Sequence, residues 1–101
     1  QPLKSDNSKF INEILKGIED KKKEIDSNLK QKIENWKFEN ISVIDRNILR
    51  FGCYELMFLK ETPVKVIINE AIELAKLYGT KKSKNFVNGI LDSVAHSLGL
   101  I

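Results

Sequence analysis

The chain has almost none of the side chains that most often carry catalysis or bind metals. It contains one cysteine, Cys53, and one histidine, His96, so an intrachain disulfide is excluded and a zinc site would need carboxylate ligands. No acidic residues stand at the sequence spacing that zinc enzymes use for their metal ligands. The five glycines are scattered rather than gathered in a phosphate-binding loop. Cys53 lies in an apolar run, which favours a buried thiol in a reducing compartment. We therefore expect a cytoplasmic protein with no catalytic residues, no metal and no cofactor.

Long apolar runs and β-strand signals are equally scarce. Apolar stretches stay far below the roughly 20 residues that span a membrane, and Lys9 and Glu13 interrupt the first of them. Val, Ile and Thr form no alternating run of the kind that predicts a strand. Pro2 and Pro63 both lie outside the segments with helical periodicity. These absences predict an all-α protein with no signal peptide and no membrane association.

Helical periodicity, in contrast, recurs along the whole chain. With 101 residues, of which 42% are hydrophobic and 31% charged, the chain can form one small domain with a packed core. Apolar residues return every three or four positions, as on the buried face of a helix. The first such stripe contains Phe10, Ile11, Ile14, Leu15 and Ile18. The pattern predicts a bundle of about five helices, over residues 6–20, 22–36, 43–60, 63–78 and 83–98.

Local signals at several helix ends support these bounds. Ser42 is expected to cap the third helix, with Asp45 three residues later in the capping-box position. Thr62 and Pro63 predict a capping hydroxyl followed by proline at the first helical position. Gly79 is expected to end the fourth helix in the left-handed conformation.

Three polar residues interrupt apolar stretches of the last three helices. These are Arg50, Glu70 and Asn88, and buried polar groups must be paired, because an unsatisfied one costs about 1–3 kcal/mol. We expect a structural hydrogen-bonded network in which they join the third, fourth and fifth helices. Gly89 is expected to allow a close helix–helix approach.

Three segments in the second half of the chain resemble the NusB family of transcription antitermination proteins. Asp45 precedes an Ile-Leu-Arg triplet at 48–50, and Tyr-Glu-Leu follows at 54–56. Residues 63–79 read P-x-x-V-x-I-N-E-A-x-E-L-A-K-x-Y-G, and residues 83–92 read S-x-x-F-V-N-G-x-L-D. The order and spacing match the family from about residue 41 to 92, whereas residues 10–36 match it in helical pattern only.

The resemblance implies a fold of two small helical subdomains, here truncated at the N-terminus. Residues 1–37 would be the remainder of the N-terminal subdomain, and residues 38–101 a C-terminal three-helix subdomain. The arginine-rich start of the family has no counterpart in this sequence. We expect the missing helices to leave an apolar groove along the first two helices, through which the chain forms homo-oligomers.

For function, the resemblance implies RNA and protein binding rather than catalysis. Family members bind boxA RNA of ribosomal RNA leaders together with the ribosomal protein NusE, and act through other antitermination factors and RNA polymerase. The net charge of +3 is compatible with such a role. The resemblance assigns Glu39 and Asp45 to NusE binding, and for Asp45 the alternative interpretation is an acid that only caps the third helix. It assigns RNA contacts to residues at the start of the fifth helix, namely Lys81, Lys82, Lys84 and Phe86. Phe86 also falls on the expected buried face of this helix, so a core residue is the alternative interpretation, and the one we favour.

Two other functions remain open at this stage. A NusB-like domain also positions substrate in ribosomal RNA cytosine methyltransferases, and the whole open reading frame would reveal such a fusion. Alternatively, the chain is a scaffolding bundle that keeps the core motifs and does not bind RNA even when the partner is present.

Overall fold

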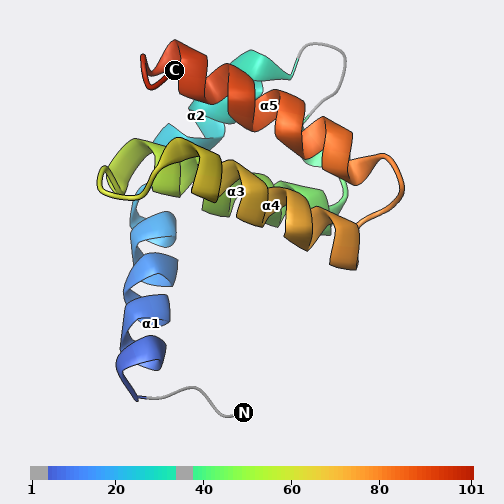
Figure 1. Ribbon diagram of the computed structural model, residues 1–101. Coiled ribbons are helices and arrows are strands. Elements are labelled where there is room, and N and C mark those ends of the chain that lie inside the picture. Colours follow the sequence, from blue (N-terminus) through green and yellow to red (C-terminus); the bar gives the residue numbers. More distant parts are fainter. Residues whose placement is uncertain (1–4, 34–37) are drawn as a thin grey trace.

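The computed structural model describes residues 5–33 and 38–101, which form five α-helices and one short 3-10 helix (Figure 1). Neither described range contains a strand, so the prediction of an all-α bundle is confirmed. The helices are α1 (Ser5–Asp20), α2 (Lys22–Lys32), η1 (Phe38–Asn40), α3 (Val43–Phe58), α4 (Val64–Tyr78) and α5 (Ser83–Ser97). The second helix ends four residues earlier than expected, and Trp36, its expected end, lies outside the described residues.

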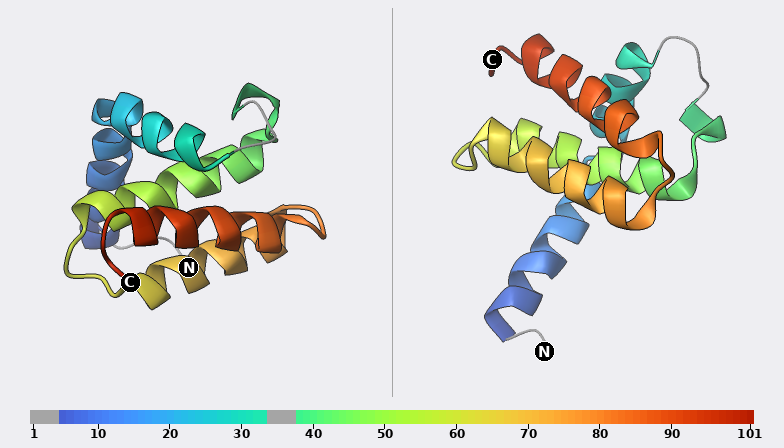
Figure 2. Two further views of the ribbon diagram at one scale, coloured as in Figure 1. Left: turned by 90° about the horizontal axis from the view of Figure 1, so that it is seen from above. Right: turned by 45° about the vertical axis from the view of Figure 1, so that its right-hand side comes forward.

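Helices α3, α4 and α5 pack against one another, and α2 covers the side formed by α3 and α5 (Figures 1 and 2). Their facing sides are apolar, because each helix repeats large aliphatic residues at helical spacing. The apolar residues with almost no exposed surface are Ile25, Leu29, Leu49, Cys53, Leu56, Ile67, Ala75, Val87, Leu91, Val94 and Ala95. One core thus includes residues from both halves of the chain.

Helix α1 projects from the bundle and packs against α2 and α3 near its C-terminal end (Figure 2). Of its expected apolar stripe, Ile14 is buried, but Phe10 is 56% and Leu15 53% exposed. Other helices therefore cover only part of the apolar stripe of α1. Helical periodicity shows which residues share a face, but it does not show whether another element covers that face.

Two glycines set the distances between helices. A Cβ atom at Gly52 would lie 2.7 Å from Cδ1 of Leu91, so the absence of a side chain lets α3 approach α5. A Cβ atom at Gly17 would collide with the Tyr54 hydroxyl where α1 crosses α3. Gly89, which the sequence suggested for this role, has open space around it, so that prediction is wrong.

The observed helix ends agree with the predicted ones at Ser42 and differ from them at Pro63 and Gly79. The Ser42 hydroxyl accepts a hydrogen bond of 3.1 Å from the Asp45 N–H, which confirms the expected cap. Pro63 occupies the N-cap position itself, with extended backbone angles (φ −60°, ψ 141°), so α4 begins one residue later than expected. Gly79 is extended (φ −95°, ψ −165°) rather than left-handed.

Candidate functional site

The three lysines that were expected to contact RNA lie together at the turn between α4 and α5. Lys81 and Lys82 belong to the turn, Lys84 stands in the first turn of α5, and all three are exposed. Phe86, expected beside them, is partly buried and packs against the core. The structure thus brings the lysines to one edge and leaves the Phe86 ring only partly accessible. Tyr78, at the end of α4, is an exposed aromatic residue near this turn, and its side chain is 64% exposed.

Hydroxyl groups fix the shape of this turn. The Ser83 hydroxyl, almost completely buried, accepts a 2.9 Å hydrogen bond from the Thr80 N–H, and the two hydroxyl oxygens lie 3.3 Å apart. The Thr80 hydroxyl in turn accepts a bond from the Lys82 N–H, also at 3.3 Å. Gly79 is required here because a Cβ atom would collide with the Ser83 side chain. The lysines are therefore presented by a turn whose backbone is held in place.

A hollow with a volume of about 430 Å³ opens beside the turn. Its lining comes from both sides of the turn and consists of Lys76, Gly79, Thr80, Lys81 and Lys84. The sequence did not predict Lys76 as a site residue, because it lies within the family motif on α4 and has the pattern of an ordinary surface lysine. Its position three residues before Gly79 could have placed it on the side of the turn.

The two acidic residues expected to contact a partner lie at the start of α3. Glu39 is exposed in η1 and forms an ion pair with Lys30, with 3.5 Å between Oε1 and Nζ. The Arg46 guanidinium donates a hydrogen bond of 3.4 Å to the Glu39 carbonyl and so holds η1 against the first turn of α3. The Asp45 Oδ1 atom is buried and has no hydrogen-bond partner among the described residues. Both acids are therefore at one corner of the fold.

The structure does not join Arg50, Glu70 and Asn88 in a network. Arg50 instead donates two hydrogen bonds to Asp26 of α2, at 2.9 Å to Oδ1 and 3.1 Å to Oδ2. Glu70 and Asn88 are both exposed. The predicted network is therefore wrong, because Arg50 lies on the side of α3 that α2 covers and pairs with an acid of that helix.

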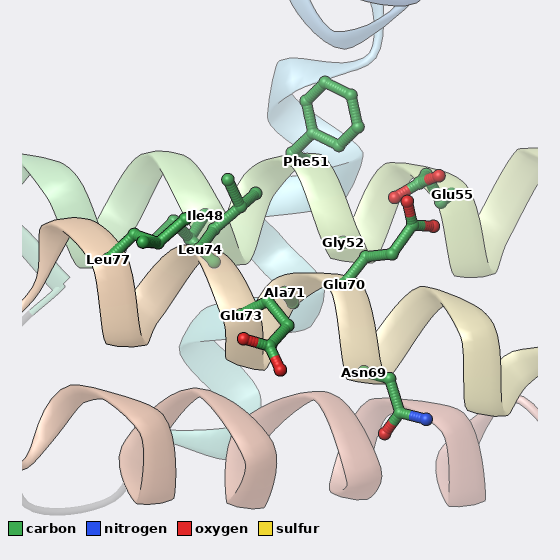
Figure 3. Close-up of a pocket in the computed structure, with 10 residues that line it drawn as sticks. All are labelled: Ile48, Phe51, Gly52, Glu55, Asn69, Glu70, Ala71, Glu73, Leu74 and Leu77. Atoms are coloured by element: carbon green, nitrogen blue, oxygen red, sulfur yellow. The ribbon is translucent and has the colours of Figure 1, made fainter.

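A groove between α3 and α4 combines apolar walls with acidic residues (Figure 3). Ile48, Leu74 and Leu77 line one end, and Glu55 and Glu70 face each other at the other end (Figure 3). Burial and, secondly, the nearby Glu70 carboxylate raise the pKa of Glu55 to about 7. Glu55 therefore changes its charge near neutral pH.

The one cysteine and the one histidine of the chain lie in different environments. Cys53 is buried, as expected, and burial followed by the charge of Asp26 raises the pKa of its thiol to about 12. His96 is exposed and lies 3.6 Å from the Asp92 carboxylate. Within residues 5–33 and 38–101, no three His, Cys, Asp or Glu side chains gather as a metal site would require. None of the helices in these ranges is long and apolar enough to cross a membrane.

Comparisons with known proteins agree with the fold and with the sequence motifs. The model of the NusB family matches residues 1–96. The chain is 48% identical over 89 residues to the transcription antitermination protein NusB of Clostridium botulinum (strain Kyoto / Type A2), covering 88% of this chain and 62% of that protein. It is 40% identical over 93 residues to the NusB protein of Bacillus mycoides (strain KBAB4), covering 92% and 72%.

A solved structure of NusB from T. maritima has the same arrangement of helices. It superimposes with a TM-score of 0.89 at 42% identity, covering 92% of this chain and 66% of that one. The chain thus spans 62% of the length of its Clostridium relative and about two thirds of the T. maritima protein. Motifs, fold and relatives agree that the chain belongs to the NusB family.

Proposed function

We propose that this chain is a non-catalytic module of a cytoplasmic transcription antitermination factor. In this role it binds boxA-type RNA of ribosomal RNA leaders together with NusE, and acts through other antitermination factors and RNA polymerase. The observation that carries the proposal is the basic turn at 80–84, in a chain whose relatives are named transcription antitermination proteins.

The basic turn suits the backbone of single-stranded RNA. Lys81, Lys82 and Lys84 are exposed and project from a turn that Thr80 and Ser83 hold in place. Lysine attracts phosphate as a point charge and reads no base sequence, so this edge contributes affinity rather than specificity. The partly buried Phe86 offers at most an edge to a base, and we propose it as a secondary contact.

The acidic corner suits a basic protein such as NusE. Glu39 is exposed on η1, and the Asp45 carboxylate has an oxygen without a hydrogen-bond partner among the described residues. Cationic side chains of the partner would be attracted to the exposed Glu39 carboxylate and to the accessible part of Asp45. The acidic corner precedes α3, and the basic turn joins α4 to α5, so different residues would contact the protein and the RNA. An RNA strand that contacts both this chain and NusE is held by two proteins at once, and each of them then raises the affinity for the RNA.

Charge reversal at the basic turn tests the RNA surface. We would measure binding of a fluorescent boxA-like RNA, in the presence of NusE, by the double variant Lys81→Glu/Lys82→Glu. The matched control is Lys60→Glu/Lys65→Glu, which changes the charge equally at the opposite end of α4, where both residues are exposed. Loss of binding in the first variant only would support the proposal.

Equal effects of the two double variants would contradict the proposed RNA surface. They would mean that net charge, and not the turn, attracts the RNA. RNA binding by neither the wild type nor its complex with NusE would favour a scaffold role.

A further inference from the structure

The hollow beside the α4–α5 turn gathers positive charge from two helices. Lys76 reaches it from the last turn of α4, Lys81 from the turn and Lys84 from the first turn of α5. Three positive charges thus line one hollow, and all of them would attract an anion bound there. The one described acid paired with these lysines is Glu73, whose Oε1 lies 3.7 Å from the Lys76 Nζ in an exposed ion pair. Such exposed pairs are weak, so Lys76 can exchange this carboxylate for a bound anion.

The lining of the hollow favours phosphate over carboxylate. Neither of the two arginines of the chain, Arg46 and Arg50, lines the hollow, so the planar fork that grips a carboxylate is missing. Three lysines and Thr80 line the hollow, and lysine binds phosphate as a point charge that does not need the planar geometry of a carboxylate. The volume of about 430 Å³ leaves room for the sugars on either side of one phosphate.

The hollow is also formed before any ligand binds. The hydrogen bonds between Thr80 and Ser83 fix the turn, and Ser83 itself is almost completely buried. Gly79 leaves no room for a side chain at the base of the turn. A ligand therefore does not have to order the backbone, which reduces the entropic cost of binding.

We infer that this hollow binds one backbone phosphodiester of a single-stranded nucleic acid, and that Lys76 is a binding residue of the site. The inference rests on the proposed RNA-binding function and adds to it a defined phosphate position and a residue outside the turn. Glu73 then acts as a competitor that occupies Lys76 when no phosphate is bound.

Two titrations of the whole chain, followed by amide chemical shifts, test this assignment. The first uses inorganic phosphate, with sodium acetate at equal ionic strength as the comparison. We expect phosphate, but not acetate, to shift the amides of residues 79–84. Lys76→Gln should reduce this shift severalfold, Glu73→Gln should increase it, and Lys65→Gln, on the exposed first turn of the same helix, should leave it unchanged. Equal shifts with phosphate and acetate would overturn the assignment.

The second titration uses a short single-stranded RNA at several salt concentrations. Each phosphate contact to a single strand contributes about 0.7 to the slope of log K against log salt. Lys76→Gln should therefore lower the slope by about 0.7, with no change for Lys65→Gln. An unchanged slope in Lys76→Gln, with RNA binding intact, would overturn the inference and leave the proposed function standing. Phosphate shifts without any RNA binding, even with NusE present, would overturn the proposed function and support the hollow as an anion site.

Discussion

Removing the ion pair between Arg50 and Asp26 should destabilise the fold by about 2 kcal/mol, between the values for exposed and buried pairs. The Arg50 guanidinium donates to both oxygens of the Asp26 carboxylate, and the two side chains are only 19% and 18% exposed. Exposed ion pairs contribute about 0.2–1 kcal/mol, whereas loss of one partner from a buried pair costs about 3–5 kcal/mol. The pair joins α2 to α3, so its loss should weaken the packing of α2 on the rest of the bundle.

Urea unfolding followed by circular dichroism would measure this contribution. We would compare Asp26→Asn, Arg50→Met and the double variant, because a double-mutant cycle isolates the energy of the pair. Arg50→Met also loses the contact of the guanidinium with the Phe38 ring, 5.0 Å away, whereas Asp26→Asn keeps it. We expect each single variant to lose about 2 kcal/mol and the cycle to give a coupling above about 1 kcal/mol. A loss below about 0.5 kcal/mol in Asp26→Asn, or purely additive effects, would refute the reasoning.

Three further predictions concern packing, protonation and the partner surface. Gly52→Ala should destabilise the fold by about 1–3 kcal/mol, because the added Cβ atom would press on the fully buried Leu91. Gly89→Ala, where the Cβ atom meets open space, should stabilise the helix by about 0.5–1 kcal/mol. Thermal unfolding of both variants would measure the two effects. The pKa of Glu55 is raised from 4.5 to about 7, so the folded state binds the proton more tightly and this residue lowers stability as pH rises from about 4.5 to 7. With a discount for partial exposure, Glu55→Gln should raise the free energy of unfolding by about 1–2 kcal/mol relative to wild type at pH 8 and should not change it at pH 4. An equal increase at both pH values, measured by urea unfolding, would contradict this pKa assignment. Asp45→Lys should abolish NusE binding, measured by calorimetry, while Asp92→Lys, on exposed α5 surface, should not; intact binding in Asp45→Lys would remove this residue from the interface.

Features that depend on neighbouring residues in the sequence could be predicted well. The cap formed by Ser42 needs only the backbone three residues later, and it forms as expected. The buried position of Cys53 follows from the apolar run around it and was also confirmed. The number of helices follows from periodicity in the same way.

Features that depend on contacts between distant segments could not be predicted. Which of two glycines lies at a helix crossing is decided by the partner helix, so Gly52 takes the role expected of Gly89. Arg50 has a partner 24 residues earlier in the sequence, and spacing alone cannot identify it. Gly79 is needed because the Ser83 side chain fills the space beside it, not because of a left-handed backbone.

For the candidate site, sequence motifs located the turn but not its full lining. Lys81, Lys82 and Lys84 are close in sequence and therefore also close in space. Lys76 joins them because the chain folds back at Gly79, which brings the end of α4 beside the start of α5. The division at residue 37 into two subdomains and the self-association through an apolar groove remain predictions.

The most direct test of the central claim is a titration of boxA-like leader RNA with this chain, with and without NusE, at two salt concentrations. We predict that NusE raises the affinity for RNA at least tenfold and that higher salt weakens the binding, since phosphate contacts carry it. The same affinity with and without NusE, or no RNA binding in either condition, would contradict the claim that this chain binds RNA as part of an antitermination complex.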